Sequence, residues 1–196
     1  MDLQRLEKEI AGIVIKINES PDLIHYPYHN LDHTQSVVAH VHEIGSFYLL
    51  NEKDLFIVTA AAWFHDIGHL YGVMQGHEAR GVLIMEQYLQ EVPKEVTTLI
   101  GECIMATQFS YQPRNLREEI ICDADTYHFG TSVFRQTDVL VHKEMEIRTG
   151  QTFPHWAQQS LQLLKTHIFY TGYCKRKLED GKKQNIRWLE SLIHLA

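Results

Sequence analysis

The sequence has few cysteines, no excess of basic residues and no long hydrophobic run, and each shortage excludes a class of protein. Three cysteines, Cys103, Cys122 and Cys174, occur in 196 residues, and no two of them form a CxxC pair. We therefore expect neither a disulfide framework nor a structural zinc knuckle, and reduced thiols favour a cytoplasmic protein. The formal net charge is −7, whereas a sequence-independent nucleic-acid binder needs a basic surface. We expect no stable nucleic-acid partner.

Membrane-spanning and strand-forming patterns are also missing. The longest apolar run, LFIVTAAAWF, has about ten residues, against the roughly 20 that a spanning helix needs. Residues 1–9 alternate charged and apolar side chains instead of forming the apolar core of a signal peptide. No useful length of chain alternates in the manner of a strand, and no internal repeat is visible. We expect no membrane contact and an all-α fold.

Helical periodicity recurs along the whole chain, with apolar residues at three- and four-residue steps. The expected helices cover residues 3–20, 32–50, 54–68, 76–89, 93–108, 116–125, 136–148, 154–170 and 171–195. Ser20-Pro21 should end the first helix, Asp32 should cap the second, and Gly68 suits a left-handed end of the third. Gly181 is expected to interrupt the last helix. No linker divides the chain, so residues 1–196 are expected to form a single domain.

His65 and Asp66 form the most informative pair in the sequence. They follow the apolar run LFIVTAAAWF at a predicted helix end. An ionised carboxylate beside such a run is costly unless a counter-charge or several hydrogen-bond donors compensate it. A neighbouring imidazole and carboxylate both offer lone pairs to a divalent cation. The pair therefore indicates half of a metal site.

Histidines gather in the N-terminal part of the chain. Of 13 in total, eight precede residue 80, namely His25, His29, His33, His40, His42, His65, His69 and His77. Histidine is the commonest metal ligand and serves as an acid or base near neutral pH, so this concentration predicts a catalytic pocket. A capping or surface role is the better interpretation for His25, His42, His142, His155 and His194.

Two further carboxylates stand at the end of an apolar run in the segment EIICDADTYHFG. Asp123 and Asp125 are two residues apart there, again an expensive place for a negative charge. One of them is expected to bind a metal, and the other to cap a helix that begins at Thr126.

With these residues in view, the chain resembles the HD superfamily of metal-dependent phosphohydrolases. The signature of that superfamily is a histidine, a later His-Asp pair and a distant aspartate. The resemblance covers about residues 28–130 by motif. Within the group, the chain looks most like the small predicted phosphohydrolases. It implies a helical HD-domain bundle, with C-terminal helices over residues 136–195. It also implies that His33, His65, Asp66 and Asp125 are the metal ligands.

The resemblance suggests roles for nearby residues as well. The YHN segment is similar to the start of the cyclic-nucleotide phosphodiesterase site, so His29 is expected to protonate the leaving oxygen. His69 stands where many HD nucleotidases have an acidic residue, and it can serve as an acid or base. His77, in HEARG, resembles an additional ligand of dinuclear HD enzymes. Glu78 is expected either to act in catalysis or to orient a ligand histidine.

The expected cofactor is one divalent metal ion per chain. A mononuclear site is preferred because Thr107 stands where dinuclear HD enzymes have a further histidine. The ligand set suits manganese, iron, nickel, cobalt, zinc or magnesium. Arg80, Arg114 and Lys165 are the candidates to bind the phosphate.

The implied function is hydrolysis of a phosphoester in a nucleotide or related small phosphorylated molecule. The metal would lower the pKa of a bound water, and Asp66 would accept its proton. One alternative is a cyclic-nucleotide or cyclic-dinucleotide phosphodiesterase, which YHN and His77 favour. A second alternative is a sensor domain that binds metal and nucleotide without turnover. Assembly as a homodimer stays open.

Overall fold

The computed structural model describes residues 2–20, 26–109 and 111–195, so Pro21 and His25 lie outside the described residues. Within these ranges the secondary structure is entirely helical, which confirms the all-α prediction. The elements are α1 (Leu3–Asn18), α2 (Leu31–Phe47), α3 (Glu52–Phe64), the 3-10 helix η1 (Ile67–Tyr71), α4 (His77–Tyr88), α5 (Lys94–Ala106), α6 (Leu116–Asp125), the 3-10 helix η2 (Tyr127–Gly130), α7 (Phe134–Thr149), α8 (Trp156–Thr166) and α9 (Gly172–Leu195). Among the described residues, no helix is long and apolar enough to cross a membrane.

Helix α3 is the centre of the N-terminal part of the fold. It contacts α1, α2, α4, α5 and α6, and every residue from Phe56 to Phe64 is buried. A helix that is apolar on all sides must be covered on all sides, which explains why the longest apolar run becomes the central helix. Its C-terminal end therefore brings His65 into the interior of the protein.

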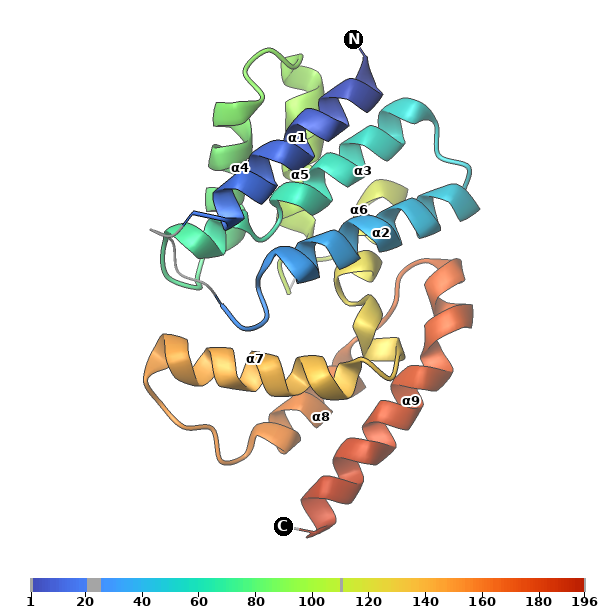
Figure 1. The fold of residues 1–196 in the computed structure, drawn as a ribbon. Coiled ribbons are helices and arrows are strands. Elements are labelled where there is room, and N and C mark those ends of the chain that lie inside the picture. The colour runs from blue at the N-terminus through green and yellow to red at the C-terminus, as the bar shows by residue number, and fades with distance from the viewer. Residues whose placement is uncertain (1, 21–25, 110, 196) are drawn as a thin grey trace.

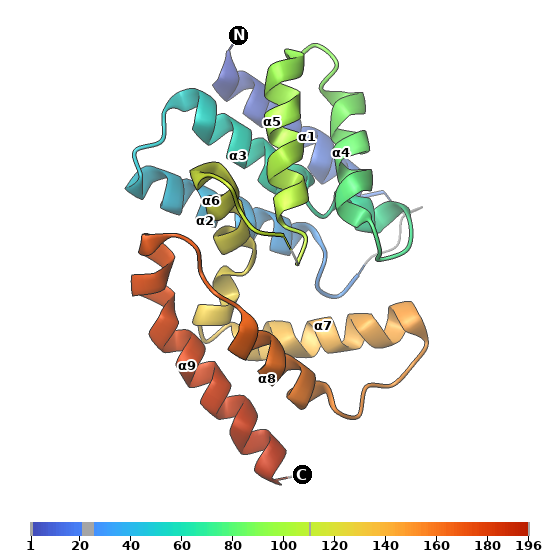
Figure 2. The same ribbon diagram turned by 180° about the vertical axis from the view of Figure 1, so that it is seen from behind.

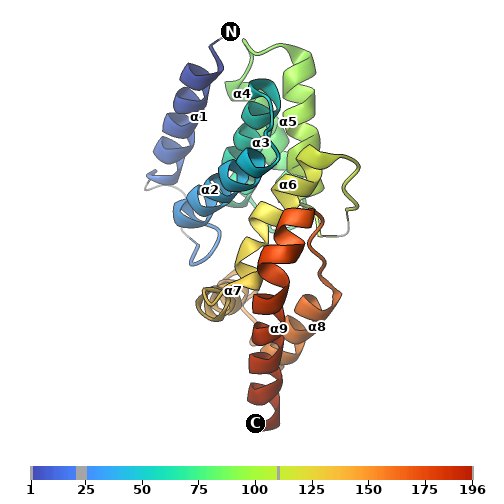
Figure 3. The same cartoon turned by 90° about the vertical axis from the view of Figure 1, so that its right-hand side faces the viewer.

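The last three helices form a second group beside this bundle. Figure 1 shows α7, α8 and α9 on the opposite side of α2 and α6 from the N-terminus, and the chain ends lie at opposite ends of the molecule. Seen from behind, α8 lies in front of α7, and α5 lies beside α4 (Figure 2). The side view in Figure 3 shows α9 extending away from the N-terminal helices. Helix α9 packs against both α8 and η2.

Gly181 does not interrupt the last helix, contrary to the sequence-based prediction. Helix α9 continues through this position, and here the glycine lies against η2. A Cβ atom at Gly181 would lie 1.9 Å from the carbonyl oxygen of Gly130. The glycine thus permits a close approach between two segments instead of ending a helix.

Several predicted helix ends also differ from those observed. Asn30, not Asp32, caps α2, and its side chain accepts a hydrogen bond from the backbone N–H of His33. Helix α8 ends at Thr166 instead of continuing to Tyr170. Gly68 does not have a left-handed backbone. A Cβ at Gly68 would lie 2.0 Å from the carbonyl oxygen of His77, so this glycine lets η1 pack directly on the start of α4.

Candidate metal centre

Four side chains from three helix ends meet in the interior. His33 lies in the first turn of α2, His65 and Asp66 follow the last residue of α3, and Asp125 is the last residue of α6. His33 Nε2 lies 3.1 Å from Asp125 Oδ1 and 3.3 Å from Asp66 Oδ2. His65 Nε2 lies 3.1 Å from Asp66 Oδ2, 3.4 Å from His33 Nε2 and 3.6 Å from Asp125 Oδ1.

His33, His65 and Asp66 are placed to share a single divalent ion, with Asp125 Oδ1 beside the two imidazoles. Ligand atoms about 2.0–2.2 Å from one ion, at tetrahedral or octahedral angles, lie roughly 3.0–3.5 Å from one another. The distances from the two imidazoles to each other and to the two carboxylates, 3.1–3.6 Å, are close to that spacing, and the group whose ligand atoms all lie within 4.8 Å of one another contains His33, His65 and Asp66. Asp66 Oδ2 is buried without a hydrogen-bond partner among the described residues, and an unsatisfied buried carboxylate oxygen is costly. A cation bound between these atoms would remove that cost.

The charges of the four groups depend on one another. Burial disfavours the charged form of each group. For the two histidines the nearby carboxylates outweigh burial, so the pKa of His33 is raised and the pKa of His65 is raised well above its ordinary value. The imidazoles in turn hold the pKa values of Asp66 and Asp125 below the ordinary range, against the effect of burial. A metal ion must displace protons from the two histidines, so metal affinity is expected to fall as the pH falls.

The orientation of His65 is set by the backbone. Its Nδ1–H donates to the carbonyl oxygen of Ala62 at 2.8 Å. This hydrogen bond directs Nε2 towards the other three ligand atoms, as is usual for metal-binding histidines.

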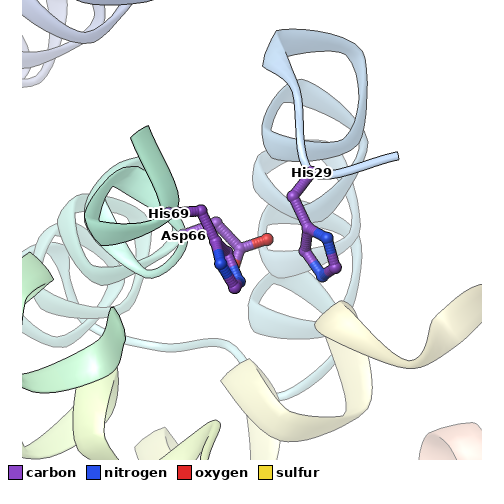
Figure 4. Close-up of side chains that lie close together, drawn as sticks. All are labelled: His29, Asp66 and His69. Atoms are coloured by element: carbon purple, nitrogen blue, oxygen red, sulfur yellow. The ribbon is translucent and has the colours of Figure 1, made fainter. Parts of the chain in front are cut away.

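Asp66 also belongs to a second group of potential ligands, with His29 and His69. Figure 4 shows its carboxylate directed into the space between the two imidazoles. Asp66 Oδ1 lies 3.8 Å from His69 Nε2 and 3.6 Å from His77 Nε2. The ring of His69 stacks on His77 at 3.7 Å and lies 4.3 Å from that of His29. The structure thus brings all three predicted histidines beside the second oxygen of Asp66.

His69 is buried and uncharged. It is 1% exposed, and neither ring nitrogen has a hydrogen-bond partner among the described residues. Burial is the main cause that lowers its pKa to about 2. A neutral imidazole with both nitrogens unpartnered can bind an ion or accept a hydrogen bond from a water molecule.

Glu78 contacts His77 but none of the four central ligands. Its Oε2 lies 3.5 Å from His77 Nδ1, which donates to the carbonyl oxygen of Met74 at 3.0 Å. The carboxylate is buried. Its position therefore suits orientation of His77, beside the second ligand group.

Glu144, a buried residue of α7, joins the site although no sequence pattern predicted it. Its Oε1 lies 2.6 Å from Nδ1 of His29, and its Oε2 accepts hydrogen bonds from the backbone N–H groups of Tyr28 and His29. Arg148 donates to the same carboxylate at 2.9 Å. Burial raises the pKa of Glu144, but the hydrogen bonds from His29 and Arg148 outweigh it and lower the pKa to about 2. The Glu144–Arg148 spacing of four residues is also that of ordinary surface ion pairs, so the sequence alone offers no distinguishing signal.

Asp123 is the aspartate that does not join the centre. Its carboxylate accepts hydrogen bonds from the backbone N–H groups of Tyr170 and Thr171 and from the Thr171 hydroxyl, at 2.6–2.8 Å. The prediction that this aspartate caps a helix at Thr126 is wrong. It instead holds the segment that leads into α9.

The three predicted phosphate-binding cations are engaged elsewhere. Arg80 donates to the backbone carbonyls of Gly68, Val73 and Gln75. Arg114 pairs with Glu118 and Lys165 with Glu190. None of the three lines the cavities beside Asp125, so their role in phosphate binding stays a prediction without support from these cavities.

Comparison with known proteins gives one family assignment. Residues 30–130 match the family model described as HD domain. This range includes all four central ligands, whereas His29 and Glu144 lie outside it. Searches of the curated proteins and of the solved structures found no match.

Proposed function

Because the chain belongs to the HD-domain family, we propose that it is a metal-dependent hydrolase that cleaves a phosphoester of a nucleotide or related small molecule. The observation that carries this proposal is the convergence of His33, His65, Asp66 and Asp125 at separations of 3.1–3.6 Å. The family consists mainly of metal-dependent phosphohydrolases, and the four ligands suit a divalent ion.

His33, His65, Asp66 and Asp125 would hold the ion, which would supply a water of lowered pKa and offset charge on the phosphoryl oxygens. The two oxygens of Asp66 have separate surroundings. Oδ2 faces His33 and His65, whereas Oδ1 faces His69 and His77. Asp66 Oδ1 is therefore suited to accept a proton from the attacking water, and the neutral His69 is suited to orient that water.

His29 is the best candidate for the acid that protonates the leaving oxygen. Glu144 engages its Nδ1 and also its backbone N–H, so the ring is held in one orientation. No hydrogen bond within the described residues engages Nε2. A carboxylate-bound imidazole with its second nitrogen available can deliver a proton to a leaving alkoxide.

A cyclic-nucleotide phosphodiesterase is the second candidate. It is favoured by the buried Glu144 behind His29 and by the position of Asp66 between two ligand groups. Hydrolysis of a cyclic phosphodiester needs the same attack at phosphorus and the same protonation of a leaving oxygen. The two candidates differ in substrate and not in the proposed roles of the residues.

The test is phosphate or nucleotide release by purified protein that has been stripped of metal and reloaded with each candidate ion. The panel contains nucleoside monophosphates, nucleoside triphosphates and cyclic nucleotides. We expect metal-dependent turnover that is lost in Asp66→Ala and kept in Asp180→Ala, which removes an exposed carboxylate on α9. Tight metal binding without turnover on any substrate would instead indicate a sensor.

A further inference from the structure

A cavity of about 190 Å³ opens directly beside the metal centre. Its walls come from the end of α5 with the segment that follows it, the end of α6, and the segment after α8. Asp125 forms part of the wall. Of the four central residues, Asp125 is the one that lines this cavity, so a phosphorylated molecule bound here would approach the metal centre from the Asp125 side.

The described walls of this cavity contain no lysine or arginine. Its histidine, His167, is uncharged, because burial and the nearby Lys182 lower its pKa to about 4. A second cavity, of about 270 Å³ on the other side of His33, also has no lysine or arginine in its described walls. Phosphates beyond the one at the metal centre would therefore have no cationic side chain to pair with.

The remaining wall contains neutral hydrogen-bonding and aromatic groups beside the apolar Ala106, Cys122 and Ile168. Gln108 and Gln112 make no side-chain hydrogen bond to another described residue, and each amide offers both a donor and an acceptor. Phe109 is 72% exposed at the same cavity, and Tyr111 adds a second aromatic face. Aromatic faces stack on nucleobases, and amides bind the polar edges of those bases.

His167 also lies in the cavity wall, and its Nε2 is 3.0 Å from the Thr126 hydroxyl oxygen. Its Nδ1 is buried without a partner among the described residues and is not accessible from the cavity.

We propose that this cavity binds the nucleoside half of a nucleoside monophosphate, with its single phosphate at the metal centre. The identification of the phosphate position rests on the function proposed above. Recognition of the nucleoside by Gln108, Phe109 and Gln112 needs no metal.

The test therefore uses the metal-free protein and measures binding of the common nucleosides by saturation-transfer NMR and titration calorimetry. We expect at least one nucleoside to bind, and Phe109→Ala and Gln112→Ala each to weaken its binding by about tenfold. Gln87→Ala, at an exposed glutamine of α4, and Leu140→Ala, in the second cavity, should bind as the parent protein does. Inorganic tripolyphosphate should neither bind nor compete.

The outcomes separate this inference from the proposed function. One outcome is nucleoside binding that is lost in the two cavity variants, together with no phosphate release by the metal-loaded protein. This outcome would support the nucleoside-binding cavity and reject the proposed hydrolase activity. Turnover of a monophosphate with an unchanged KM in both variants would keep the hydrolase and overturn the cavity assignment. Absence of nucleoside binding, or tight binding of tripolyphosphate, would also overturn it.

Discussion

The Glu144 carboxylate lies 2.6 Å from Nδ1 of His29, although 115 positions separate the two residues. If this contact positions His29 as the acid, Glu144→Gln should lower kcat by roughly 100-fold, within the range of general acid–base catalysis, and leave KM nearly unchanged. Steady-state kinetics on the substrate found in the panel would measure this effect.

A nitrophenyl phosphate ester provides the control for that variant, because its leaving group needs no proton. The loss of kcat should be much smaller on this ester than on the natural substrate. An equal loss on both substrates would show that Glu144 has a structural role only. The double variant His29→Gln/Glu144→Gln should be little worse than either single variant, because residues that act as a unit are not additive.

Metal affinity should fall more when Asp125 is removed than when His77, on the other side of Asp66, is removed. Asp125→Ala removes one of the four central ligands, so it should weaken metal binding by more than the roughly 10- to 100-fold cost of losing an outer partner. His77 lies near one of the four central residues, Asp66, at its Oδ1, so His77→Ala should weaken metal binding by less than about tenfold. Metal content after dialysis against graded chelator would measure both, and equal losses would indicate that both ligand groups share the ion.

Acid sensitivity should depend on Glu43, which joins α2 to η2 and α9. Its carboxylate accepts hydrogen bonds from Tyr127, Tyr173 and Lys177 at 2.6–2.8 Å. Burial raises its pKa, but these three hydrogen bonds outweigh it and lower the pKa to about 2. A carboxyl group with a lowered folded-state pKa stabilises the protein above its unfolded value near 4.5, and this contribution is lost as the pH falls towards 2.

Urea unfolding of the metal-free protein between pH 6 and pH 2 would test this expectation. The stability of Glu43→Gln should fall less steeply than that of the parent protein between about pH 5 and pH 2. Glu52→Gln, at an exposed residue in the first turn of α3, is the matched control and should follow the parent curve. Identical slopes in all three proteins would contradict the role of Glu43.

The crossing of α9 and η2 should make Gly181 intolerant of any side chain. Gly181→Ala places a methyl group 1.9 Å from the Gly130 carbonyl oxygen, so it should destabilise the fold by about 1–3 kcal/mol or more. Gly12→Ala, within α1, meets no atom within 4 Å and should stabilise the protein by about 0.5–1 kcal/mol. Thermal melts of the two variants would measure these opposite shifts, and an unchanged Gly181→Ala melting temperature would refute the close crossing.

Local patterns in the sequence were sufficient to predict the helices and to single out His65 and Asp66, whereas His33 and the choice of Asp125 over Asp123 came from the resemblance to the HD signature. Helical periodicity depends on residues three or four apart, so most helices are found close to their predicted ranges. A His-Asp pair directly after a run of apolar residues is an uncommon local pattern, and this pattern pointed to His65 and Asp66. The caps were less predictable, because Asn30 and Asp32 are both suitable residue types and only the backbone geometry decides between them.

Contacts between distant segments were decided only by the tertiary structure. In the sequence Glu144 is an ordinary helix carboxylate and Asp123 is a candidate ligand or cap, yet Glu144 holds His29 and Asp123 holds the entry to α9. Glycine is a residue type that often interrupts helices, but Gly181 instead allows Gly130 to approach α9 closely. The sequence determined which residues are able to form a metal centre, because that ability is a property of residue type and local burial. Folding determined which groups support that centre and which are engaged elsewhere, because hydrogen bonds and close contacts depend on distances between segments far apart in the chain.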